Sequence, residues 1–351
     1  MTFVNVDEGS VRFYYIEMRI LVTGGGGFLG SYIIKELLKN PGYIVTNFSR
    51  HAYPSLEDIG VPTIKGNLQN VGDISRALDQ GFDAIFHVAA LAGVWGKYED
   101  YYGINYLGTR NLLEAAKSRG IKRFVYTSTP SVVFDKGDLM GVAEEQPYAE
   151  KFLNAYSETK TMAEKLVLEM NDSESFLTCA LRPHLIWGPG DPHLFPRVIQ
   201  KGKEGKLRIV GDGENLVDII YVENAARAHV QAFEHLSPGS RVCGQAYFLG
   251  QERPVKLWDF INQVLSIVKV EPVMSSIDVS TAYRLGWFLE KMFKLLGIQK
   301  PEPPMTRFVA LNLGKSHYFS HEKARRDFGY TPQVSIEEGL KRTFSYRENL
   351  K

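Results

Sequence analysis

"RILVTGGGGFLG", residues 19 to 30, joins a run of apolar residues to four consecutive glycines and the start of a helical pattern. In such a strand–loop–helix sequence the N–H groups of the helix N-terminus point at a ligand, and a pyrophosphate suits them best. A purely structural turn is the alternative, which this setting disfavours. Gly24, Gly27 and Gly30 are expected to supply the tight turn, the close backbone approach and the helix–strand contact, while Gly25 and Gly26 tolerate positive φ. The residues expected to contact a dinucleotide here are Gly24, Gly27, Phe28, Leu29 and Gly30.

From residue 18 onward, short β-branched runs alternate with longer helical patterns. This alternation predicts a doubly wound α/β fold, in which a parallel sheet is covered by helices on both faces. A helix is expected at about 154 to 172 and a sixth strand at 177 to 183, after which the alternation fades. The predicted division is an N-terminal extension (1–17), a dinucleotide-binding Rossmann domain (18–190, with 223–250 returning to it) and a smaller α+β substrate-binding region (191–222 and 251–351).

Composition excludes several classes of protein. The 351 residues include 41 Lys and Arg against 40 Asp and Glu, without a basic tract, so we expect no nucleic-acid partner. Cys179 and Cys243 lie far apart without metal-ligand spacing, so we expect no metal site and a cytoplasmic location. Residues 1–17 lack the basic and apolar regions of a secretory signal, and we assign them no function.

The end of the second predicted strand, "NFSRHAY", bears on the choice of cofactor. An NAD site places an Asp or Glu there to bind the ribose 2′-hydroxyl. Here Ser49 and Arg50 occupy that position, and a guanidinium can bind a 2′-phosphate with two hydrogen bonds. We therefore expect NADP(H), with NAD(H) as the alternative and a mere surface role for Arg50 also open.

Tyr156 and Lys160, in "AYSETK", lie four residues apart and therefore on one face of the expected helix. The spacing alone is equally typical of a solvated helix face. The position favours chemistry, because the preceding strand ends in "YTST" and brings the hydroxyl of Thr129 to the carboxyl edge of the sheet, where such folds bind ligands. Ser128 lies beside it.

The motifs "TGGGGFLG", "HVAA", "INYLGT", "YTST", "YSETK" and "LRPHLIWGPGD" occur in an order and at intervals that resemble the extended short-chain dehydrogenase/reductases. The resemblance extends from Met18 to the C-terminus. Within that superfamily the four-glycine loop, "AALAGVWGKYEDYYGINYLGTRNLL" and the tail "PPMTRFVALNLGKSHYFSHEKARRDFGYTP" are most similar to the 3β-hydroxysteroid dehydrogenase family.

The resemblance implies a role for each matching residue. Tyr156 would be the general acid/base, Lys160 its support, Thr129 the hydroxyl that polarises the carbonyl, and Asn105 the asparagine that holds a water behind the lysine. Hydride transfer from the nicotinamide to a ketone carbon would accompany proton transfer from Tyr156 to the oxygen. Because a neighbouring ammonium stabilises a phenolate, we expect Lys160 to lower the pKa of Tyr156.

The resemblance also implies further cofactor contacts. Where the family has "GDL", this chain has "GNL", and Asn67 could still accept a hydrogen bond from the adenine amine through its amide oxygen. His87 and His184 match no catalytic position, and we expect both to be hydrogen-bonded structural histidines. The residues expected along the cofactor are Asn67, Leu68, Ala89, Lys160, Pro183 and Leu185.

The implied substrate is a lipid-like ketone, a 2-alkyl-3-oxoalkanoate reduced to the 3-hydroxy acid. A 3β-hydroxysteroid or sterol is the alternative, and a nucleotide sugar is disfavoured because Pro130 and Ser131 follow Thr129 where sugar dehydratases have an Asp-Glu pair. The pattern at 282–297 predicts an amphipathic helix packed on its own core, with an exposed lid or a membrane-touching helix as alternatives. Related enzymes imply a homodimer, and a partner enzyme of the same pathway is possible.

Overall fold

The computed structural model describes residues 2–7, 10–15 and 17–348. Its centre is a sheet of seven parallel strands with helices on both faces, which confirms the predicted doubly wound α/β class. In order across the sheet, the strands are β14 (Gln245–Leu249), β9 (Leu177–Pro183), β7 (Arg123–Thr127), β6 (Ala84–His87), β3 (Met18–Thr23), β4 (Tyr43–Ser49) and β5 (Thr63–Lys65).

Strand order reverses at β3, whose neighbours are β4 on one side and β6 on the other. A reversal of this kind leaves a crevice beyond the carboxyl ends of the strands, because the following connections leave in opposite directions. The first glycine loop follows β3 and therefore opens into that crevice. The fold thus fixes the position of the site before any side chain is considered.

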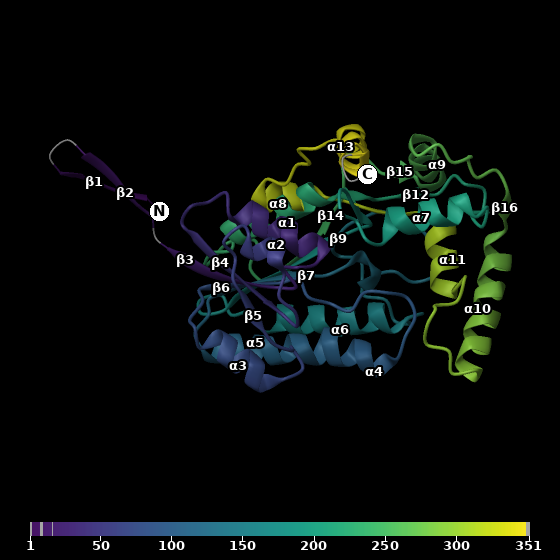
Figure 1. Cartoon of the computed structure of the whole chain (residues 1–351). Coiled ribbons are helices and arrows are strands. Elements are labelled where there is room, and N and C mark those ends of the chain that lie inside the picture. The colour runs from purple at the N-terminus through teal and green to yellow at the C-terminus, as the bar shows by residue number, and fades with distance from the viewer. Residues whose placement is uncertain (1, 8–9, 16, 349–351) are drawn as a thin grey trace.

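Two apolar cores lie on the two faces of the sheet, and Figure 1 shows the helices that cover each face. One core includes α1 (Phe28–Leu37) and α8 (Val222–Glu234), which pack on one another. The other face carries α3 (Val71–Leu78), α5 (Gly108–Ser118) and α6 (Ala155–Glu169). Central strands buried on both faces account for the nearly continuous apolar runs in the sequence, as in "LTCALRP", every residue of which is buried.

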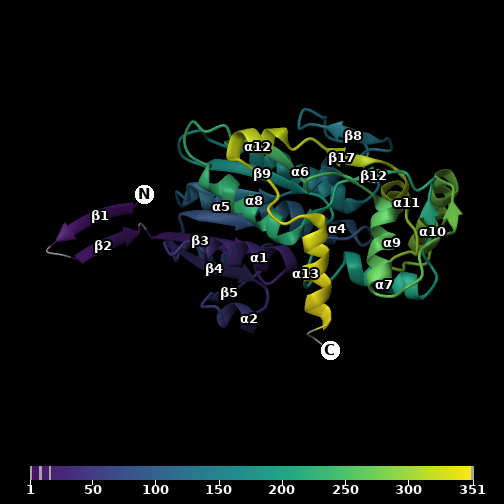
Figure 2. The same cartoon turned by 90° about the horizontal axis from the view of Figure 1, so that it is seen from above.

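A second region lies at one end of the molecule, toward the right of Figures 1 and 2. Helix α9 supplies the largest share of its core, to which α7 and the C-terminal helix α13 (Ile336–Glu348) also contribute. Its helices are α7 (Leu194–Lys203), α9 (Leu257–Ile267), α10 (Val279–Leu295) and α11 (Arg307–Gly314). Its small sheet has the order β15 (Val255–Lys256), β12 (Leu216–Val217), β17 (His317–Phe319) and β8 (Leu139–Val142). Two further strand pairs are β10 (Ile186–Trp187) with β13 (Ile220–Tyr221), and β11 (Ile209–Val210) with β16 (Ser276–Ile277).

Several segments connect the two regions. β8 leaves the first region to pair with β17, while α12 (Glu322–Phe328) returns to pack on β14. The remaining elements are α2 (Pro54–Glu57), α4 (Tyr98–Tyr101), the π-helix η1 (Tyr102–Leu107) and the 3₁₀ helix η2 (Pro130–Val132).

Both views show an antiparallel hairpin of β1 (Thr2–Asp7) and β2 (Ser10–Tyr15) projecting from the body. This hairpin falls within the stretch that we interpreted as an extension. Among the residues described, no helix has the length and apolar character needed to cross a membrane.

Helix α10 differs from its prediction. The residues it buries are Ala282, Gly286 and Glu290, whereas Trp287 and Phe288 are 49% and 58% exposed. A Cβ at Gly286 would lie 2.6 Å from the Thr306 carbonyl carbon, so the small face of the helix packs against the start of α11. The prediction that its large apolar side chains pack on their own core is therefore wrong: the close approach to α11 uses the small residues instead.

Candidate active site

The glycine loop between β3 and α1 has a backbone that only glycine fits. Gly24 has a φ of +71°, and a Cβ there would lie 2.8 Å from the Ala89 Cα atom. Of the four loop glycines, Gly24 alone takes a positive φ, and the tight turn is made there. Gly26 is required for space, since its Cβ would lie 2.2 Å from the Tyr53 ring.

The N-terminus of α1 is suited to an anion. Its N-cap, Gly27, offers no side chain to accept the free N–H groups, and the first turn contains no acidic residue. A Cβ at Gly30 would lie 2.3 Å from the Gly24 carbonyl oxygen, so the helix approaches the strand as closely as a backbone allows. The loop therefore fits the pyrophosphate of a dinucleotide, held by N–H groups and the helix dipole.

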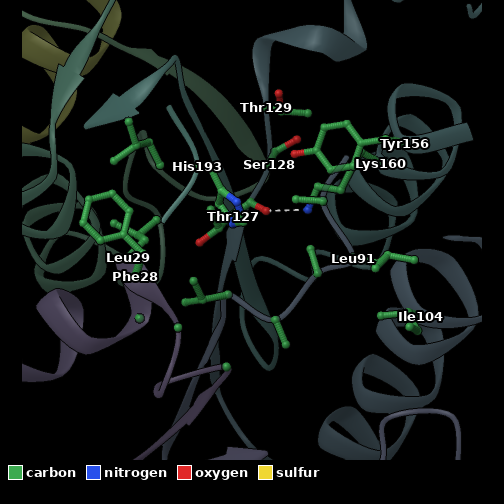
Figure 3. Close-up of a pocket in the computed structure, with 18 of the residues that line it drawn as sticks. Phe28, Leu29, Leu91, Ile104, Thr127, Ser128, Thr129, Tyr156, Lys160 and His193 are labelled. Atoms are coloured by element: carbon green, nitrogen blue, oxygen red, sulfur yellow. Dashed lines mark hydrogen bonds between the residues drawn. The ribbon is translucent and has the colours of Figure 1, made fainter. Parts of the chain in front are cut away.

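One cavity of about 580 Å³ extends from this loop to the start of α6 (Figure 3). It brings together residues from the ends of six strands, as the reversal of strand order predicts. Every site residue predicted from the sequence lines it except Asn105; their individual roles remain predictions. The lining includes Gly24, Gly27, Phe28, Leu29, Gly30, Ser49, Arg50, Asn67, Leu68, Ala89, Thr129, Tyr156, Lys160, Pro183 and Leu185.

Tyr156 points into the cavity beside Ser128 and Thr129 (Figure 3). Burial raises the pKa of Tyr156 to about 12, although a hydrogen bond with Thr129 acts in the opposite direction. The expected lowering of the pKa of Tyr156 by Lys160 is therefore not found in this structure, because desolvation outweighs the stabilising groups. A phenol with so high a pKa stays protonated at neutral pH and can serve as a proton donor.

Lys160 follows one helical turn later and is only 2% exposed. Its Nζ atom donates a hydrogen bond of 2.6 Å to the Thr127 carbonyl oxygen and lies 4.1 Å from the centre of the Tyr126 ring. Burial lowers the pKa of Lys160 to about 7, while the charge of Glu164 opposes the change. At neutral pH the side chain is therefore about half protonated.

This pKa predicts a pH dependence of the reaction. The kcat/KM for ketone reduction should fall as pH rises through about 7, because the group has lost its positive charge above that pH. A pH–rate profile from about pH 6 to 9 would show the loss of one proton. Lys160→Arg, whose guanidinium keeps its charge, should give a lower but flat profile. If kcat/KM of the wild type does not change over this pH range, the charge of Lys160 does not affect the reaction.

Asn105 lies in the π-helix η1, outside the cavity lining. Its Oδ1 atom accepts a hydrogen bond of 2.7 Å from the Leu91 N–H, and its Nδ2 atom donates to the Leu91 carbonyl oxygen at 3.0 Å and to Thr159 Oγ1 at 3.3 Å. Asn105 thus holds Leu91, which does line the cavity. Its implied role in holding a water remains a prediction, since both amide hydrogens are already used.

The two histidines are hydrogen-bonded structural residues, as predicted. His87 is buried between the hydroxyls of Thr23 and Thr109, at 2.7 and 2.8 Å. Burial lowers the pKa of His87 to about 3. His184 borders the cavity and hydrogen-bonds His317 at 2.6 Å.

Several lining residues were missed in the sequence. Phe308 and Asn312 both come from α11 and lie four residues apart, a spacing that places them on one face and could have indicated them. His193 enters from the loop before α7. Its neighbour Asp191 accepts hydrogen bonds from the N–H groups at the start of α7, so its carboxylate serves the helix.

Comparison with known proteins identifies this architecture. The model of the 3-beta hydroxysteroid dehydrogenase/isomerase family matches residues 21–276. The chain belongs to that family. It is therefore an NAD(P)-dependent oxidoreductase, and the family predicted from the motifs is confirmed.

Among the relatives of this 3β-hydroxysteroid dehydrogenase family member, the 2-alkyl-3-oxoalkanoate reductase of Stenotrophomonas maltophilia is 47% identical over 93% of this chain and 98% of that protein. The sterol-4-alpha-carboxylate 3-dehydrogenase (decarboxylating) of Mus musculus is 35% identical over 92% of this chain and 89% of its own. A solved structure, the UDP-glucuronic acid 4-epimerase of Bacillus cereus in complex with NAD, is similar with a TM-score of 0.72 and 26% identity, covering 95% of this chain and 99% of the other.

Proposed function

We propose that this protein is an NADPH-dependent reductase that converts a 2-alkyl-3-oxoalkanoate to the 3-hydroxy acid. The observation that carries the proposal is the placement of the Tyr156 hydroxyl, with Ser128 and Thr129, in the same cavity as the glycine loop. The name of the Stenotrophomonas maltophilia relative supports the substrate. Apolar side chains on the substrate side of the cavity, including Leu91, Ile104 and Phe308, suit a lipid-like ketone better than a sugar.

The residues present divide the work of reduction. When bound, the reduced nicotinamide supplies a hydride to the ketone carbon. Thr129 and Ser128 orient the ketone oxygen toward the Tyr156 hydroxyl, and Tyr156 gives its proton to that oxygen, so a C–H and an O–H bond replace the C=O π bond. Lys160 would hold the ribose hydroxyls of the cofactor and, when protonated, would supply positive charge at this end of the cavity. The high pKa of Tyr156 supports reduction, because the proton is present when the step begins.

Arg50 supports the choice of NADPH. The residue is exposed, borders the cavity directly after β4, and is the only charged residue between β4 and Tyr53. Its neighbour Ser49 hydrogen-bonds the His51 carbonyl oxygen at 2.7 Å, which fixes the turn that presents Arg50. Within residues 17–348, neither a hydrogen bond nor an ion pair engages the Arg50 guanidinium, so it is available for a 2′-phosphate.

Arg50→Ala should therefore raise the KM for NADPH about tenfold or more and leave the KM for NADH nearly unchanged, because only NADPH carries the phosphate. Initial rates with both cofactors at saturating ketone measure the effect. NADH serves as the internal control. An equal rise for both cofactors, or for neither, would assign Arg50 to another role.

The substrate is tested by absorbance at the reduced-nicotinamide band. NADPH and NADH are each offered with a 2-alkyl-3-oxo acid and, in the reverse direction, NADP⁺ and NAD⁺ with a 3β-hydroxysteroid; epimerisation of a UDP-sugar is followed separately. We expect turnover of the oxo acid with NADPH. Turnover of the steroid alone would favour the 3β-hydroxysteroid alternative over the oxo acid.

We also propose a homodimer in which α5 and α6 pack against their copies. The two helices lie next to one another on the outer face of the sheet (Figure 1), which is the arrangement that a four-helix interface requires.

We further propose a cytoplasmic location. The cysteines Cys179 and Cys243 are both free thiols, which supports that location.

A further inference from the structure

A second, smaller cavity of about 100 Å³ lies next to the catalytic one. Four side chains of α9 and three of α7 form most of its wall, among them Phe195, Val198, Phe260 and Val264. Of its twelve lining residues, only Asn312 and His317 carry polar side chains. The wall is therefore almost entirely hydrocarbon.

The Asn312 amide nitrogen and both ring nitrogens of His317 make hydrogen bonds within the protein. The Asn312 Nδ2 atom donates to the Phe308 carbonyl oxygen at 3.1 Å. The His317 ring hydrogen-bonds the Asn312 carbonyl oxygen through Nε2 at 2.9 Å and His184 through Nδ1 at 2.6 Å. A cavity needs polar partners to hold water, whereas a purely apolar one stays dry and takes hydrocarbon. This cavity is suited to hydrocarbon.

Leu185 and Asn312 line both cavities, so these two residues form the boundary between them. Leu185 has a φ of +43°, a left-handed conformation that is rare for a residue with a branched side chain. Such strain is found at sites that clamp ligands, where the surrounding structure holds it in place. The strained backbone lies in the short connection between β9 and β10 and places Leu185 at the boundary of the two cavities.

We propose that the smaller cavity binds the alkyl branch of the substrate while its ketone lies at Tyr156. This inference rests on the proposed function and adds the position of the 2-alkyl chain. An apolar cavity of about 150 Å³ takes benzene, so by scaling, 100 Å³ holds a segment of about four carbon atoms. The branch would pass from the reacting centre to α7 and α9 beside Leu185.

The preference for branch length tests this placement. With 3-oxo acids that carry a 2-methyl, 2-ethyl, 2-propyl, 2-butyl, 2-pentyl or 2-hexyl group, each methylene added up to butyl should raise kcat/KM about threefold to fourfold. The gain should level off once the branch exceeds about four carbons, since the cavity is then full. Initial rates at low substrate give kcat/KM for each member of the series.

Val198→Phe should abolish the gain. Val198 is half-buried on α7, and a phenyl group there occupies the cavity without replacing a fully buried side chain. Val71→Phe, at a position 59% exposed on α3, makes the same chemical change outside the cavity and should keep the wild-type series. If Val198→Phe keeps the wild-type dependence on branch length, the alkyl chain binds elsewhere.

A measurement without turnover separates this inference from the proposed function. The buried Trp187 ring lies 5.5 Å from Phe195 and 5.6 Å from Phe260, which line the cavity, so 1-bromobutane bound there should quench tryptophan fluorescence. Quenching should saturate in wild type and Val71→Phe and be lost in Val198→Phe. Absence of turnover with every 3-oxo acid would overturn the proposed function, whereas absence of saturable quenching would overturn the hydrocarbon site.

Discussion

Tyr156→Phe is expected to lower kcat for ketone reduction by about 10²- to 10⁴-fold, the usual contribution of a positioned general acid. The ring stays in place, but the proton that would pass to the ketone oxygen is gone. Steady-state or stopped-flow assays at saturating NADPH and ketone measure the loss of kcat. Since the phenyl ring still fills its site, the affinity for NADPH should change little, and titration of the cofactor's fluorescence checks this.

A matched control for this substitution is Tyr98→Phe. The hydroxyl of Tyr98 donates a hydrogen bond of 3.3 Å to Glu158 at the molecular surface, where the residue is 40% exposed. Its removal also costs one phenol, yet should leave kcat within about twofold, since surface changes alter little. Should Tyr156→Phe behave like this control, another group donates the proton.

Arg182→Ala is expected to lower the free energy of unfolding by about 3–5 kcal/mol, because it leaves the buried Glu164 carboxylate without its partner. Arg182 is 3% and Glu164 0% exposed, and Arg182 Nε donates to Glu164 Oε2 at 3.0 Å. Burial alone would raise the pKa of Glu164, but the Arg182 charge and hydrogen bonds hold it below its ordinary value. Urea unfolding followed by circular dichroism gives the difference.

Arg253→Ala provides the comparison at an exposed ion pair. Arg253 and Glu337 are 53% and 62% exposed, so the same change should cost no more than about 1 kcal/mol. A loss of similar size in both variants would mean that the buried pair contributes only as a surface pair does. Removal of both partners, in Arg182→Met with Glu164→Leu, should recover much of the stability, since no unpaired charge then remains.

Residues close together in the sequence were the ones whose arrangement could be predicted. The spacing of Tyr156 and Lys160 places both on one helix face, and the glycine loop is defined by the strand and helix that flank it. The parallel sheet followed from alternation because buried central strands must be apolar on both faces. Each of these features depends on a local period or on a short connection.

What could not be predicted depends on tertiary approach. The pKa of Tyr156 is set by how deeply the ring is buried, and no spacing in the sequence reports depth. Asn105 turns toward Leu91 because the loop after β6 passes beside the π-helix. For α10, periodicity predicted an apolar face, but whether another element covers such a face depends on the path of the rest of the chain.

Helix α6, which carries Tyr156, is attached to two neighbouring strands at two points one turn apart. Lys160 holds the Thr127 carbonyl at the end of β7, and Glu164 holds Arg182 on β9. Because the two contacts fix the helix to the sheet at two points, the helix cannot rotate about its axis. Because they involve different strands, it also cannot shift along its axis. These two attachments therefore hold α6 rigidly, so that the Tyr156 hydroxyl keeps one position in the cavity. Any change of shape that a substrate requires would come from the residues on the substrate side of the cavity.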